Sequence, residues 1–246
     1  MYRLSLIVLS LLWQGCATPN TQLRDQPHIE RLRIQISKAR NAIAETRGAI
    51  AEARGAPHLA ELYVRLAELM SDEAGYHFQV AYEREHRSGK SLHVPQVRFL
   101  KLKAVGLYEL VLREYPTTPL APRVLFNMGQ EHRELGDYDK MRVALERLVK
   151  DFPTSSLRPD ALLILGDDQF DRNSIEQAGA YYSQLLTGPV TRKTGLGHYK
   201  MAWVYVNKAE CKPALKHFEQ AIVKSEAWFS KSGERLKKGD VGTQSD

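Results

Sequence analysis

The sequence predicts an all-α fold in which an N-terminal heptad helix is followed by a solenoid of about four helical hairpins. Two observations carry this prediction: isoleucines spaced seven residues apart near the N-terminus, and an apolar pattern from residue 57 that recurs every 36 or 37 residues. With 246 residues, 43% of them hydrophobic, the chain has enough apolar material for a core. Eleven prolines and sixteen glycines are near average usage, which excludes a collagen-like or broadly disordered chain.

Residues 1–16 form the first predicted unit, a secretion signal. Arg3 supplies a positive charge, and Leu4 to Trp13 is an apolar run of ten residues, about half of what a membrane-spanning helix needs. The Gly15-Cys16 pair resembles the cleavage junction of a bacterial lipobox, in which the cysteine is lipidated and becomes the new N-terminus. The resemblance implies that Cys16 carries a lipid anchor. The alternative is an ordinary signal peptide cut elsewhere, for instance after Ala17.

A heptad helix is predicted at residues 27–56, after a polar linker at 17–26. Its apolar seam repeats every seven residues, at Ile29, Ile36, Ile43 and Ile50, with a small or apolar residue three places after most of them. Such a seam packs against another copy of the chain or against the protein's own next helix. Gly48 and Gly55 each cost a helix about 1 kcal/mol relative to alanine, which weakens an isolated coiled coil. We therefore favour packing onto the next helix and keep self-association through the isoleucines as the alternative.

The repeats occupy residues 57–230, and the unit at 122–153 is the clearest of them. It carries Gly129 in its first helix, Gly136-Asp137-Tyr138 in the turn, and Pro153 at its exit. These residues resemble the tetratricopeptide repeat, a pair of antiparallel helices that buries its apolar faces by stacking on its neighbours. The next two units match it at Gly166 and Ala202, and a fourth lies upstream. Residues 231–246 are polar and are expected to form a frayed tail.

Each repeat residue has a packing role in this prediction. Glycines in the first helix allow its partner to approach closely, and Tyr182 and Phe218 are expected to fill the gaps between hairpins. Asn173 stands where the turn of the repeat usually has glycine. Prolines such as Pro153 end a helix because their ring cannot continue its hydrogen bonds.

No pattern of residues points to catalysis, a metal or a cofactor. The eight histidines lack metal-ligand spacing, and the Asp167, Asp168 and Asp171 cluster reads as a solvated helix face. The net charge of +6 comes from interleaved charges, so nucleic acid is not implied. Cys16 and Cys211 are too few for a disulfide scaffold, and with Cys16 lipidated we expect Cys211 to be shielded, an intermolecular disulfide being the alternative.

The family resemblance implies a binding surface. Tetratricopeptide repeats bind ligands on the concave face lined by the first helix of each pair. Transferred to this chain, that face supplies a partner-binding groove formed by Phe126, Gln130, Arg133, Leu163, Asp167, Phe170, Tyr199, Trp203 and Asn207. Aromatic residues and arginine often dominate binding energies. The alternative for Phe126, Phe170 and Trp203 is that they pack against the neighbouring helix.

Together these features predict a non-enzymatic scaffold of a bacterial cell envelope. Ala17 stands where an inner-membrane retention signal has Asp, so the lipobox resemblance implies anchoring at the periplasmic face of the outer membrane, with periplasmic or outer-membrane proteins as partners. The order of elements resembles the repeat proteins of the Tol-Pal system in cell division, of outer-membrane barrel assembly and of gliding machinery. A peptidoglycan enzyme activator and a spacer that acts through its heptad helix are the competing functions.

Overall fold

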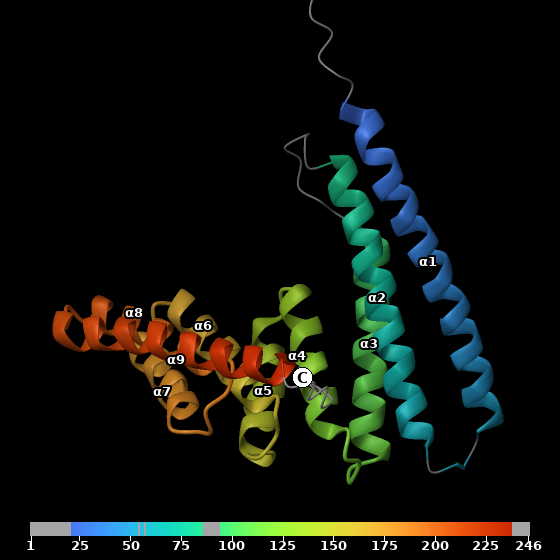
Figure 1. The fold of residues 1–246 in the computed structure, drawn as a ribbon. Coiled ribbons are helices and arrows are strands. Elements are labelled where there is room, and N and C mark those ends of the chain that lie inside the picture. The colour runs from blue at the N-terminus through green and yellow to red at the C-terminus, as the bar shows by residue number, and fades with distance from the viewer. Residues whose placement is uncertain (1–20, 54, 57, 86–93, 238–246) are drawn as a thin grey trace, which may run out of the picture.

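The computed structural model describes residues 21–237 apart from residues 54, 57 and 86–93, and this part of the chain is all-α, as predicted. Three long helices lie side by side at the N-terminal end, and the remaining hairpins extend to one side from their lower end (Figure 1). The helices are α1 (Thr21–Glu52), α2 (Leu59–Glu85), α3 (Pro95–Glu114), α4 (Ala121–Glu134), α5 (Tyr138–Asp151), α6 (Arg158–Asp171), α7 (Ile175–Leu186), α8 (Thr194–Asn207) and α9 (Cys211–Lys237). Four hairpins, α2/α3, α4/α5, α6/α7 and α8/α9, follow α1 within the described residues, which confirms the predicted architecture.

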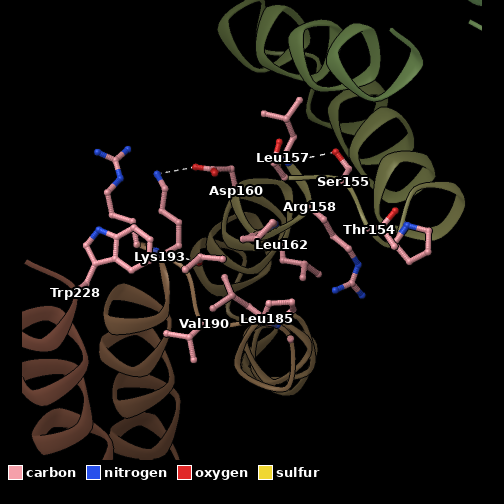
Figure 2. A pocket seen from close by; sticks show the side chains of 17 residues that line it. Thr154, Ser155, Leu157, Arg158, Asp160, Leu162, Leu185, Val190, Lys193 and Trp228 are labelled. Carbon is pink, nitrogen blue, oxygen red and sulfur yellow. Dashed lines mark hydrogen bonds and ion pairs between the residues drawn. The ribbon is translucent and has the colours of Figure 1, made fainter. Parts of the chain in front are cut away.

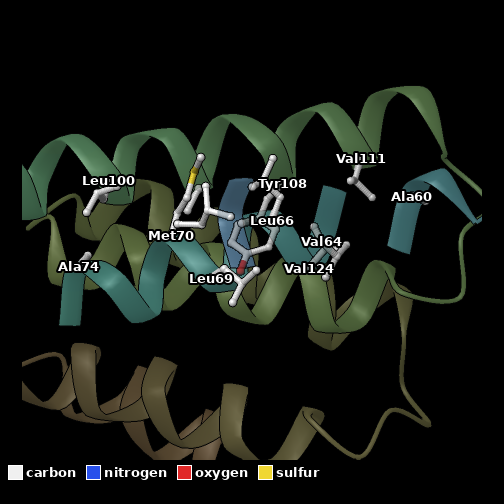
Figure 3. Packing of buried hydrophobic residues seen from close by; sticks show 13 residues of the cluster. Ala60, Val64, Leu66, Leu69, Met70, Ala74, Leu100, Tyr108, Val111 and Val124 are labelled. Atoms are coloured by element: carbon white, nitrogen blue, oxygen red, sulfur yellow. The ribbon is translucent and has the colours of Figure 1, made fainter. Parts of the chain in front are cut away.

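The heptad seam of α1 packs against α2 within the same chain. Ile36 is buried, and Ile43 joins a cluster formed by α2, α3 and α4 around Met70 and Tyr108 (Figure 3). An ion pair of 2.7 Å between Arg40 Nε and the buried carboxylate of Glu73 fixes the same two helices. Because the central isoleucines are covered within the chain, the structure agrees with the favoured packing of this seam onto the next helix.

The boundaries of three predicted segments differ in the structure. Helix α1 begins at Thr21 and continues through Pro27, so the expected linker at 17–26 is partly helical. Pro27 lies in the second turn of α1, where it removes one backbone hydrogen bond and its ring crowds the carbonyl four residues earlier, yet the helix continues through it, so this proline does not mark the boundary. The helix ends at Glu52, before residue 56, and Gly55 turns the chain with a φ of 82°. At the other end, α9 runs to Lys237 and includes the first residues of the expected tail.

The predicted close approaches within the hairpins are present. A Cβ atom on Gly129 would lie 2.8 Å from Leu145 Cγ, and one on Gly166 would overlap the ring of Tyr182. The Tyr182 ring is fully buried, and its hydroxyl donates a 2.7 Å hydrogen bond to Asp167 Oδ1. Burial, followed by this carboxylate, raises the pKa of Tyr182 well above its usual value. The two glycines therefore set the distance between the helices of their hairpins.

One turn conformation recurs between the helices of the last three hairpins. Gly136, Asn173 and Ala209 occupy the same place after the first helix, and all three have positive φ angles, of 78°, 60° and 58°. Asparagine tolerates this left-handed conformation better than most residues. Asn173 thus replaces the expected glycine without changing the turn.

Candidate partner-binding surface

The predicted groove residues lie on the first helices of the last three hairpins. Phe126, Gln130 and Arg133 are on α4; Leu163, Asp167 and Phe170 on α6; and Tyr199, Trp203 and Asn207 on α8. Arg133, Tyr199, Trp203 and Asn207 are exposed. Leu163 is only 6% exposed and belongs to the core between α6, α7 and α8, so its place in a groove was predicted wrongly. It lies on the same stripe of α6 as Asp160 and Asp167, whose partners Lys193 and Lys200 belong to the next hairpin, so that hairpin covers it.

Two aromatic residues of the prediction are shared between core and surface. Phe126 packs against the cluster of α4, α5 and α6, and Phe170 packs against the next cluster along the solenoid. Both are half-buried. The packing alternative therefore accounts for most of their surface, and the part left to a partner is small.

The polar groove residues make contacts within the chain. Asp167 accepts the hydrogen bond from Tyr182 and also forms a 3.0 Å ion pair with Lys200 Nζ of α8. Asn207 donates to the backbone oxygen of Trp203, at 2.9 Å. Gln130 Oε1 is buried without a hydrogen-bond partner. Asp167 thus joins two neighbouring hairpins and is not a free carboxylate for a ligand.

The exposed aromatic residues of the predicted groove belong to a cluster formed by Tyr199, Trp203 and Phe218. Their rings meet edge to face, with centroids 5.9 Å apart for Trp203 and Phe218 and 6.3 Å apart for Tyr199 and Trp203. Leu196 and Val206 extend the exposed apolar surface along α8. Large rings held rigidly by one another offer apolar area to a partner at a small cost in conformational entropy.

Sequence reasoning missed the apolar residues exposed on α9. Leu215, Ile222 and Phe229 recur every seven residues, and each is at least 60% exposed. They follow Phe218 around the helix, so they continue the surface of the aromatic cluster onto α9. The repeat period could have identified them. Leu215 and Ile222 stand 36 residues after Gly179 and Leu186, so they occupy the equivalent positions of the next hairpin.

A pair of histidines joins α8 to α9. The Nδ1 atoms of His198 and His217 lie 3.0 Å apart, so one ring donates and the other accepts, and at least one ring is neutral. Burial lowers the pKa of both, and for His198 the neighbouring His217 and Lys224 lower it further. Among the described residues no group of three potential ligands is placed to hold a metal ion. We interpret the pair as a contact between the helices.

A recess of about 400 Å³ lies between the turns that precede α6 and α8 (Figure 2). Leu162, Leu185 and Val190 line its apolar part, and Trp228 of α9 contributes to its wall. Two of its cations have acceptors in the protein: Lys193 Nζ lies 2.6 Å from Asp160 Oδ1, and Arg158 donates to Val149 O and Gln184 Oε1. The recess therefore offers mainly apolar surface.

The remaining cysteine prediction is corrected by the structure. Cys211 begins α9 and is exposed, where shielding was expected. The turn after α8 places it at the first helical position of α9. Cys16 lies outside the described residues.

None of the described helices combines the length and the apolar character that crossing a bilayer requires.

Comparison with known proteins agrees with this fold. Residues 123–155, which cover α4 and α5, match the tetratricopeptide repeat family. A crystal structure of MamA has a TM-score of 0.51 and 15% identity, covering 79% of this chain and 96% of that one. BtubC from P. vanneervenii gives 0.44 and 16%, covering 80% and 92%, and MamA from Desulfovibrio magneticus gives 0.43 and 16%, covering 76% and 96%. No curated protein matches the sequence. The chain thus has a helical solenoid of the tetratricopeptide type.

Proposed function

We propose that the protein is a non-enzymatic scaffold that binds a partner protein on the concave face of its repeats. The observation that carries the proposal is the pair of exposed rings of Tyr199 and Trp203, which pack against the half-buried Phe218 on the last hairpin. Soluble proteins rarely leave several large rings together in water unless the surface has a function. The fold supports the same function, since stacked helical hairpins form extended concave binding surfaces.

The partner segment has a chemistry that this surface selects. Rings that meet edge to face leave apolar faces and edges against which a bulky side chain of a peptide or helix packs. Arg133, exposed on α4, offers a cation farther along the same row of first helices. The segment is therefore an amphipathic peptide or helix with large apolar side chains and at least one carboxylate.

Site-specific crosslinking in the native envelope tests this function. A photoreactive residue at position 199 is expected to capture a defined protein, and Trp203→Ala is expected to reduce its yield at least tenfold, as for a binding hot spot. The matched control is a photoreactive residue at Val143, which is 67% exposed on α5. The groove is not the site if Trp203→Ala and Arg133→Ala leave every captured partner unchanged while helix content is preserved.

The location belongs to the same proposal. The apolar run of Leu4 to Trp13 and the Gly15-Cys16 junction support a lipid anchor at Cys16, and Ala17 supports the periplasmic face of the outer membrane. Acyl chains bind a bilayer with about 0.8 kcal/mol per buried methylene, so several chains hold the protein firmly.

Metabolic labelling checks the anchor. The wild-type protein is expected to incorporate labelled palmitate and to fractionate with outer membranes, whereas Cys16→Ser is expected to lose the label completely and leave the membrane fraction. A Cys16→Ser variant that keeps both the label and the membrane fractionation would contradict the anchor.

A further inference from the structure

The contact between the last two hairpins shows which residues of one hairpin hold the next. Three ion pairs cross it: Asp160 with Lys193, Asp167 with Lys200, and Glu176 with Lys208, at 2.6, 3.0 and 2.9 Å. Two glycines lie between them. A Cβ on Gly179 would lie 3.2 Å from Val204 Cγ1, and one on Gly197 would overlap Leu185 and lie 3.2 Å from Leu186 Cδ2. Helix α8 thus sits on α6 and α7 through one face.

The same positions recur 36 residues later, where no further hairpin follows among the described residues. Leu196 and Trp203 stand at the positions equivalent to Asp160 and Asp167. Leu215 is equivalent to Gly179, and Ile222 to Leu186. We call Leu196, Trp203, Leu215 and Ile222 the end face. All four are 40 to 63% exposed. In the preceding hairpin, α8 packs against the equivalent positions. The four residues of the end face have no such neighbour among the described residues, and all of them are apolar.

We propose that the end face binds an amphipathic helix of a partner protein, seated where the first helix of a further hairpin would lie. The contact between α8 and the preceding hairpin defines the chemistry of that helix. The partner helix presents apolar side chains at the positions of Lys193, just before α8, and of Lys200, within α8, because these side chains would face Leu196 and Trp203. The partner helix has a small residue at the position of Gly197. It has an acidic residue at the position of Lys208, because the end of the solenoid has Lys212 at the position equivalent to Glu176, the partner of Lys208.

The charges beside the end face disfavour a second copy of the chain as the occupant. Leu215, Ile222 and Phe229 would pair in an antiparallel α9 dimer centred on Ile222. That register brings Glu219 of one copy beside Glu226 of the other, and like charges at such positions repel. The polar stretch after α9 has Val241 as its only large apolar residue, so it lacks the stripe that the end face requires.

The end face adjoins the surface of Tyr199, Trp203 and Phe218 and shares Trp203 with it. Leu215 and Ile222 lie outside the predicted groove residues and test the end face alone. The probe is a fluorescent peptide of residues 192–209 that carries Lys193→Leu, Lys200→Leu and Lys208→Glu. We expect it to bind the full chain in fluorescence anisotropy. Ile222→Glu and Leu215→Glu are expected to weaken binding at least tenfold, and Val143→Glu, at an equally exposed apolar position of α5, to leave it unchanged.

Two further measurements complete the test. A control peptide with Gly197→Glu and Val204→Glu, which places charges on the docking face, is expected not to bind. Circular dichroism verifies that each protein variant keeps its helix content. The proposal is overturned if the probe does not bind, if Ile222→Glu or the control peptide has no effect, or if sedimentation shows a wild-type dimer that Ile222→Glu converts to monomer. None of these outcomes depends on the concave groove, so each proposal can fail alone.

Discussion

Replacing Lys101 by methionine is expected to destabilise the protein by about 3–5 kcal/mol, the cost of breaking a buried ion pair from one side. The Lys101 side chain is 7% exposed, and its Nζ lies 2.9 Å from Glu131 Oε2 and 2.7 Å from Glu134 Oε2. Burial pulls the pKa of Lys101 down, but the hydrogen bonds and charges of the two glutamates outweigh it and raise that pKa above its usual value. Lys101 on α3 is thus held in its charged form by α4.

The cost arises from the partner that remains. Without the ammonium group, Glu131, whose side chain is 9% exposed, would keep an uncompensated charge between α3 and α4. Glu134 is 55% exposed and would be solvated by water. Chemical denaturation followed by circular dichroism measures the loss. The double variant Lys101→Met, Glu131→Leu is expected to recover most of it, because both charges are then removed. Equal stability of Lys101→Met and the wild-type protein would show that the cluster contributes nothing to folding.

The Lys101 cluster also shows what the sequence does not reveal. Lysine and glutamate within helical patterns are read as solvent-facing, and nothing in the spacing of residues 101 and 131 indicates a contact. The contact exists because α3 and α4 cross where both side chains point inward. The heptad seam was easier to read, since its period alone predicts one continuous apolar face. The period does not say which helix covers that face, because both α2 and a second copy of the chain fit the pattern.

The groove was only partly predictable for a related reason. Family positions identify residues on the first helix of each hairpin, but the local packing decides which of them reach solvent. Leu163 turns into the core, whereas Trp203 stays exposed because no further hairpin covers it among the described residues. The 36-residue period, visible in the sequence, is sufficient to find the end face once the neighbouring contact is known.

Gly166→Ala is the second change with a large expected effect, a net destabilisation of about 1–3 kcal/mol from overpacking. The added methyl group would overlap the ring of Tyr182, which is fully buried and hydrogen-bonded to Asp167. The ring has to move, and this strains the contact between α6 and α7. Alanine's better helix propensity, worth up to about 1 kcal/mol, offsets only part of the cost. Thermal and chemical denaturation measure the difference.

Gly106→Ala is the matched control, because Gly106 lies inside α3 with no atom within 4 Å of its added Cβ. It is expected to stabilise the protein by about 0.5–1 kcal/mol. If the two variants shift stability in the same direction, the packing argument is wrong. The last hairpin indicates how an alanine is tolerated: Ala202 takes the place of Gly166, and Phe218, in the place of Tyr182, is half-buried and packs against Tyr199 and Trp203. A ring that turns outward at this position adds to the proposed binding surface, so a residue that would strain an inner hairpin suits the last one.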